Sequence, residues 1–122
     1  MPWELDSDRP IYAQIVDRLK HEIVSGFYPP GSRLPSVRDL AAQASVNPNT
    51  MQKAFTELEH TGLIVTRRTS GRTVTEDTAL IEQVRSELAE LQISQFLTRM
   101  QHLGYQKDDS IRLLLAKKEE IS

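Results

Sequence analysis

The dipeptide Asn47-Pro48 is the feature that most constrains the fold of this 122-residue chain. Asparagine is a strong helix N-cap and proline is tolerated at the first helical position, so a helix begins here. Ser36 is a second N-cap, and Asp39 follows it at the positive end of the helix dipole. Because the helix after Ser36 is expected to end near residues 43–45, a turn of about three residues joins the two helices.

A longer helix and a structured loop are expected ahead of this pair. Residues 10–25 carry apolar side chains at helical spacing, with Pro10 in the first turn and Gly26 after the last. Residues 27–35 contain three prolines and one glycine, which indicates an ordered loop. Gly62 is expected to end the third helix.

A basic hairpin is expected after the third helix. Residues 63–67 and 72–75 are β-prone, and residues 68–71 are expected to form the loop between them. Helix, loop, short helix, tight turn, helix and hairpin, in that order, make up a winged helix-turn-helix. The predicted fold is therefore mainly α with a small β-hairpin, and residues 1–76 are expected to form the DNA-binding domain.

Residues 77–122 are expected to form a two-helix dimerisation module. Asp77 caps a long helix that runs to Leu103 and ends at Gly104, and a final helix covers residues 107–118. The long helix carries too much apolar surface for a lone surface helix. The side chains predicted to form the dimer interface are Ile81, Val84, Leu88, Leu91, Phe96, Met100 and Leu114. In the last helix, the side chains expected to point inward are Ile111, Leu114 and Leu115.

The start of the third helix carries polar side chains suited to reading DNA bases. Asn49 and Gln52 carry amides that pair with base edges, adenine above all, and Thr50 suits a phosphate or a thymine methyl. Lys53 lies one turn into the helix, where its ammonium can reach a phosphate or a guanine. An exposed, amide-rich face here has no obvious role in stability, so we expect it to enter the major groove.

Helix N-termini and cations around this face suit the phosphate backbone. Backbone N–H groups at Ser36 and Asn47 favour anions, and Arg38 lies on the exposed side of the second helix. The wing residues expected to contact DNA are Arg67, Arg68, Ser70, Gly71 and Arg72. Taken singly, each of these residues would be an ordinary helix cap or solvated charge, and it is their combination that favours DNA.

The distribution of charge agrees with this assignment. The net charge of −2 is unfavourable for a nucleic-acid binder by itself. Between Arg33 and Arg72, however, six basic and three acidic side chains give a net charge of +3. From Asp77 onward, six basic and eight acidic side chains give −2. Any surface that faces phosphates is therefore expected in the middle of the chain.

Other classes of function find little support. The chain has no cysteine, and His21, His60 and His102 lack a spacing that would place two of them on one face as metal ligands. There is no phosphate-cradling loop and no nucleophile motif, so we expect no enzyme, no metal and no cofactor. The sequence shows neither a membrane span nor a signal peptide, and a cytoplasmic location is expected.

A protein-interaction module is the alternative from another class. The polar third helix of a winged helix could meet a partner protein instead of DNA. The wing arginines and the net charge of +3 in the central segment weigh against this reading. Salt dependence discriminates between the two, because binding to duplex DNA weakens steeply with salt.

Three runs of sequence resemble the GntR family of bacterial regulators: residues 30–41 (PGSRLPSVRDLA), 46–50 (VNPNT) and 58–64 (LEHTGLI). The resemblance covers about residues 10–75. The closing helices, which hold the run Leu103-Gly104-Tyr105, look like the YtrA subfamily. This resemblance implies repression, and dimerisation through the C-terminal helices. Because the two-fold symmetry of a dimer is mirrored in its DNA, the expected target is a palindromic operator.

Two positions depart from the pattern of the family. Pro48 stands where many relatives outside this subfamily have arginine, so Asn49, Gln52 and Lys53 must carry more of the base reading. Thr69 stands at the first glycine of the Gly-x-Gly that is common in the wing. The C-terminal helices are too small to enclose a drug-sized ligand within one subunit, so a small-molecule effector is expected at the dimer interface or near the wing base.

Overall fold

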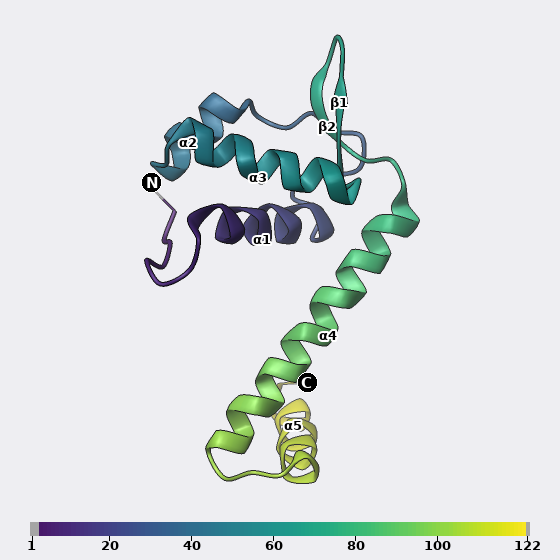
Figure 1. Ribbon diagram of the computed structural model, residues 1–122. Coiled ribbons are helices and arrows are strands. Elements are labelled where there is room, and N and C mark those ends of the chain that lie inside the picture. The colour runs from purple at the N-terminus through teal and green to yellow at the C-terminus, as the bar shows by residue number, and fades with distance from the viewer. Residues whose placement is uncertain (1–2, 122) are drawn as a thin grey trace. The chain divides into compact units, whose positions relative to one another are not determined.

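The computed structural model describes residues 3–121, and its first three helices lie together (Figure 1). α1 (Ile11–Val24), α2 (Val37–Ala44) and α3 (Pro48–Thr61) correspond to the three helices expected from the sequence. Both α1 and α2 pack against α3. The predicted mainly helical fold with a small hairpin is confirmed.

Side-chain caps fix the tight turn between α2 and α3. The Asp39 N–H donates a hydrogen bond of 3.0 Å to Ser36 Oγ, and the Asn49 N–H donates one of 2.7 Å to Asn47 Oδ1. Both predicted N-caps are confirmed. Ser45 ends α2 with a φ of 58°, in the left-handed region, which turns the chain sharply toward the start of α3.

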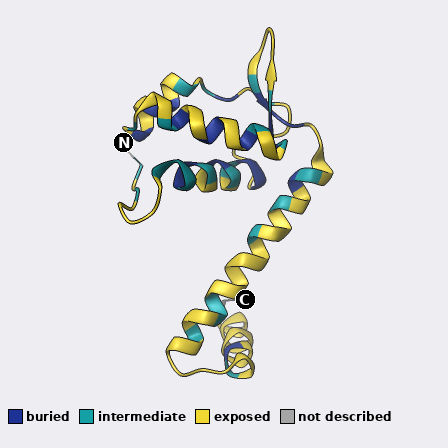
Figure 2. Cartoon of the chain, viewed as in Figure 1, coloured by how far each residue is buried: buried dark blue, intermediate teal, exposed yellow. Residues whose placement is uncertain are grey.

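The core of the first of two compact units, which ends at Arg85, is centred on α3. Four of its side chains, Met51, Ala54, Phe55 and Leu58, are each 0% exposed. The other buried apolar side chains of residues 3–120 are Ile15, Leu19, Ile23, Val24, Leu34, Leu40, Ala41, Ala44, Leu63, Ile64, Val74 and Ile81. Figure 2 shows that buried residues concentrate in α1, α2, α3 and the base of the hairpin.

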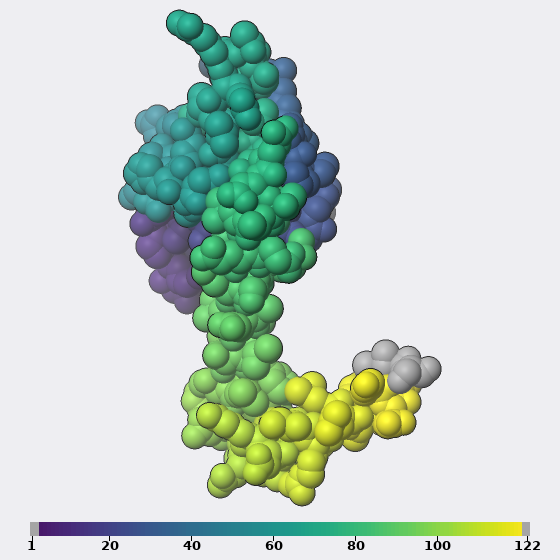
Figure 3. Space-filling model, turned by 90° about the vertical axis from the view of Figure 1, so that its right-hand side faces the viewer, coloured from purple at the N-terminus to yellow at the C-terminus, as the bar shows by residue number. Residues whose placement is uncertain are grey.

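β1 (Ile64–Arg67) and β2 (Gly71–Val74) form the predicted antiparallel hairpin. Residues 31–34 of the proline-rich loop add backbone pairing to β2, and the Leu34 N–H donates to the Arg72 carbonyl at 2.9 Å. This pairing anchors the base of the hairpin on the helical core. Its tip extends beyond the rest of the first unit, as a wing does (Figure 3).

The chain divides into two compact units within α4 (Thr78–His102), and the first unit includes the chain up to Arg85. The start of α4 belongs to the first unit because it packs there. Ile81 is 5% exposed, and Arg85 Nε donates a hydrogen bond of 3.1 Å to the Val24 carbonyl. Ile81 thus belongs to the core of the first unit and not to the dimer interface in which the sequence analysis placed it.

The second unit consists of the remainder of α4, from Ser86, and α5 (Lys107–Ile121). The three side chains of α5 expected to point inward are exposed: Ile111 by 50%, Leu114 by 51% and Leu115 by 58%. The expectation of an inward face is wrong within the single chain, because no described element of the chain covers these side chains.

We predict that replacing Leu40 with alanine destabilises the protein by about 2–5 kcal/mol. The residue is only 1% exposed, and it lies on α2, which packs against α3. Chemical denaturation of the full chain measures the free energy of unfolding. Gln43→Ala, at an exposed position of the same helix, is the matched control and should change it by less than about 0.5 kcal/mol. Equal effects of the two variants would contradict this account of the core.

Candidate nucleic-acid interface

The first turns of α3 present the polar face that the sequence predicts. Burial of the opposite stripe of the helix turns Asn49, Gln52 and Lys53 outward, and all three are exposed. Thr50 is half-buried. This face therefore offers two amides and one ammonium to a partner, with a hydroxyl at its edge.

Gln52 is held by hydrogen bonds within the protein. Its Nε2 lies 3.4 Å from Thr56 Oγ1, one turn further along α3. Its Oε1 lies 3.5 Å from Nη2 of Arg72, on strand β2. The amide of this predicted base reader is therefore oriented by its neighbours before any DNA arrives.

Lys53 is directed toward α1. Its Nζ lies 3.9 Å from the centroid of the Tyr12 ring, in a cation–π contact. Sequence reasoning did not link the two residues, which lie on different helices. The contact holds the ammonium at the boundary between α1 and α3, where it suits a phosphate better than the centre of a groove.

The helix caps place further donors around this face. The side-chain oxygens of Ser36 and Asn47 are already engaged with backbone N–H groups, so these residues shape the helix N-termini. Arg38 is exposed in the first turn of α2. An anion at either N-terminus would meet a positive helix end, with Arg38 beside one of them.

The tip of the hairpin is basic and exposed. Arg67, Arg68, Ser70 and Gly71 all lie on its surface. Arg33 was not among the predicted contacts, yet its guanidinium lies beside Gly71 and its backbone forms a bridge with β2. The basic stretch of sequence already included Arg33, but the pairing that brings it to the wing joins segments far apart in the chain.

Arg72 differs from the other wing arginines because it is bound internally. Its Nε donates a hydrogen bond of 2.9 Å to Oε1 of Glu59 on α3, and the two side chains are 26% and 31% exposed. Thr66 Oγ1 donates to the other oxygen of Glu59, also at 2.9 Å. Sequence reasoning missed Glu59, since its partners lie on separate strands and no local signal marks them.

The carboxyl of Glu59 titrates below its usual range. Burial opposes its ionisation, but the hydrogen bonds donated by Arg72 and Thr66, with the positive charge of Arg72, outweigh that effect. The pKa of Glu59 is therefore lowered from its ordinary value of 4.5. The carboxylate is charged at neutral pH and ties α3 to both strands of the wing.

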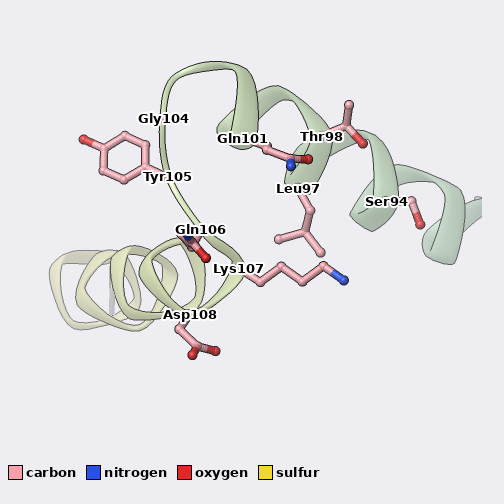
Figure 4. Close-up of a pocket in the computed structure, with 9 residues that line it drawn as sticks. All are labelled: Ser94, Leu97, Thr98, Gln101, Gly104, Tyr105, Gln106, Lys107 and Asp108. Carbon is pink, nitrogen blue, oxygen red and sulfur yellow. The ribbon is translucent and has the colours of Figure 1, made fainter.

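A hollow of about 770 Å³ lies in the second unit, where α4 turns toward α5 (Figure 4). Polar side chains supply most of its lining, among them Ser94, Thr98, Gln101 and Lys107, and Leu97 adds an apolar surface. Within residues 3–121, no group of three or more His, Cys, Asp or Glu side chains could hold a metal ion. Across the same residues, no helix is long and apolar enough to cross a membrane.

A winged helix-turn-helix with this exposed face defines the class of DNA-binding transcriptional regulators. Residues 11–74 match the family model described as bacterial regulatory proteins, gntR family. The chain belongs to this family, as its resemblance predicts, and is a transcriptional regulator and not an enzyme.

Individual relatives agree with this assignment. The chain is 39% identical over 100 residues to the HTH-type transcriptional repressor YtrA of Bacillus subtilis (strain 168), covering 80% of this chain and 76% of the relative. Its fold is similar to that of a GntR family transcriptional regulator from Listeria monocytogenes, with a TM-score of 0.82, 41% identity and coverage of 92% and 98% of the two chains. AraR(DBD) in complex with operator ORX1 is similar over 62% of this chain and 92% of its own, with a TM-score of 0.52 and 26% identity.

We predict that Glu59→Gln lowers the free energy of unfolding by about 1–2 kcal/mol at neutral pH, because it removes a charged acceptor of two hydrogen bonds. The folded state lowers the pKa of Glu59, so its contribution is complete above the unfolded value and is lost as the pH falls through the lowered one. The difference between variant and parent should therefore shrink below about pH 4.5. Denaturation across this pH range measures it, with Glu57→Gln on the same helix as the control, and a pH-independent difference would contradict the prediction.

Proposed function

We propose that this regulator represses transcription by binding a palindromic operator as a homodimer. The observation that carries the proposal is the exposed polar start of α3, flanked by the cations of α2 and the wing. In this arrangement the second helix of the pair enters the major groove and its first residues meet base edges. Asn49 and Gln52 are assigned to base edges, and Thr50 to a phosphate or a thymine methyl.

The surrounding cations are assigned to the phosphate backbone. Arg38 and Lys53 flank the reading face, and Arg67 and Arg68 lie on the wing, where they would follow the adjacent groove. The capped N-termini at Ser36 and Asn47 add backbone N–H groups. Contacts of Ser70 and Gly71 would bring the wing backbone close to the DNA, and Arg33 extends the same basic surface.

The second unit supports a homodimer because it leaves an unusual amount of apolar surface uncovered. With the exception of Phe27, all of the exposed large hydrophobic residues of the described chain belong to this unit. They are Leu91, Ile93, Leu103, Tyr105, Ile111, Leu113, Leu114 and Leu115. Full burial of one such side chain is worth about 1.5–3 kcal/mol, so covering several of them favours association. Exposed apolar side chains in this number indicate an interaction site.

A second copy of the chain is the proposed occupant of this surface. Half-buried Val84, Leu88, Phe96 and Met100 continue the apolar side chains of α4, so they remain in the proposed interface with Leu91 and Leu114. Two-fold pairing uses the same surface on both subunits. It would present two α3 helices to two half-sites, which is the reason for expecting a palindrome.

The relatives support a role in repression and a cytoplasmic location. YtrA, which shares most of its length with this chain, is named as a transcriptional repressor. A repressor that acts on bacterial DNA works in the cytoplasm, where we place this protein. The hollow between α4 and α5 is the place we assign to a small-molecule effector, because it adjoins the proposed dimer surface at Tyr105.

We predict that Gln52→Ala changes the base preference at one position of each half-site, whereas Arg68→Ala weakens binding to all duplexes alike. The amide reads a base edge, and the arginine neutralises a phosphate. Binding to an array of all short duplex sequences, repeated at two salt concentrations, measures both effects. Arg68→Ala should also reduce the salt slope by about one. The opposite pattern would show that the two roles are assigned wrongly, and DNA binding that is insensitive to salt would favour a protein partner.

We predict that the double variant Leu91→Glu/Leu114→Glu is monomeric, since it places charges in the proposed apolar interface. Sedimentation equilibrium should give twice the chain mass for the parent and once the chain mass for the variant. Gln92→Glu/Ala116→Glu introduces the same charge at neighbouring exposed positions and should remain dimeric. A monomeric parent at micromolar concentration would contradict the dimer.

A further inference from the structure

The carboxylate of Glu59, on α3, binds both strands of the wing at one cross-strand pair. Glu59 accepts hydrogen bonds from Thr66 on β1 and Arg72 on β2, each of 2.9 Å. Thr66 and Arg72 are directly opposite one another in the register of the hairpin. The wing is therefore fixed to α3 at one cross-strand pair, and Arg72 is the member of that pair that reaches further.

Arg72 continues from this ion pair to a predicted base reader. Its guanidinium carbon lies 5.2 Å from the centroid of the Phe55 ring, and its Nη2 lies 3.5 Å from Gln52 Oε1. A guanidinium has five donors and no acceptor, so it is the oxygen of the Gln52 amide that faces it. Gln52, Thr56 and Glu59 lie along one side of α3, and this side carries a continuous chain of hydrogen bonds to the wing.

The orientation of the amide has a consequence for base recognition. Glutamine reads adenine with both ends of its amide: the oxygen accepts from N6 and the nitrogen donates to N7. Arg72 engages one lone pair of the Gln52 oxygen and sets its positive charge beside the other, so the amino group is the end better suited to meet the DNA. One of its hydrogens points to Thr56, and the other is left to donate to a base.

We propose that Glu59 and Arg72 are positioning residues that present Gln52 to the major groove as a hydrogen-bond donor. At the base pair that Gln52 meets, this arrangement favours a base edge that offers only acceptors, guanine N7 and O6 or thymine O4, over adenine, whose N7 acceptor lies beside the N6 donor. The proposal rests on the proposed function, in which Gln52 reads a base. It reassigns Arg72 from a phosphate contact to a determinant of specificity, and it replaces the expectation that Gln52 reads adenine above all.

The first test is Arg72→Ala in the full chain, with binding measured on an array of all short duplex sequences. The base pair read by Gln52 is identified first, as the position at which Gln52→Ala loses discrimination. At that position, Arg72→Ala should shift the ratio of guanine or thymine to adenine by about tenfold toward adenine, because the freed oxygen can accept from N6. Other positions should keep their preferences. Arg67→Ala, at an exposed position of β1, is the control and should lower affinity for all sequences alike.

A second variant, Arg72→Lys, tests whether the effect of Arg72→Ala comes only from loss of the fold. Arg72→Lys keeps the positive charge beside Glu59, but its single ammonium replaces the planar fork that reaches both acceptors. It should retain the affinity and the thermal stability of the parent and relax the discrimination at the Gln52 position in the same direction. In the background of Gln52→Ala, neither change at position 72 should alter base preference further.

The outcomes separate the proposal from the function on which it rests. A uniform loss of affinity in Arg72→Ala, with unchanged base ratios, would overturn the positioning role and show a phosphate contact. A parent that already prefers adenine at the Gln52 position would overturn it as well. If Gln52→Ala changes no base preference while the parent still selects a sequence, this inference fails and sequence-specific DNA binding stands. A parent that selects no sequence would refute the proposed function itself.

Discussion

The complete burial of one stripe of α3 is the constraint on which the rest of this structure depends. Met51, Ala54, Phe55 and Leu58 follow helical spacing and lie wholly inside the core. Once these side chains are buried, the rotation of the helix about its axis is fixed. The polar residues between them therefore face the solvent. The reading face is therefore a consequence of the hydrophobic core, and mutations in the core would disturb recognition without touching DNA.

The wing depends on the same helix through a different kind of interaction. The carboxylate of Glu59 accepts one hydrogen bond from each strand of the hairpin, while residues 31–34 hold the base of the hairpin from the other side. A two-stranded hairpin by itself is marginally stable in water, so these attachments decide where its basic tip lies. Charge within the first unit is thus used in two ways. Arg72 binds Glu59 within the unit, and the arginines of the tip, Arg67 and Arg68, are exposed to solvent.

Local sequence signals predicted much of this fold, but they did not predict contacts between residues that are far apart in the chain. The cap at Asn47 could be predicted because a cap depends on residues within one turn of it. The contacts of Arg72 with Glu59 and of Lys53 with Tyr12 could not, since their partners lie on different elements. Helical spacing placed Ile81 on an apolar stripe but did not show which residues cover that stripe. In the structure, Ile81 lies in the core of the first unit. Sequence therefore predicted which side chains form the outward face of α3, but not how their neighbours orient them.

We propose that two copies of this chain place their two α3 helices in successive major grooves of one operator. Selection of bound duplexes from a random library by the 122-residue chain is the experiment that tests this proposal. We expect an inverted repeat whose half-sites are centred about one helical turn, or a multiple of it, apart. Recovery of a single half-site without a symmetric partner, or of no common sequence, would contradict it.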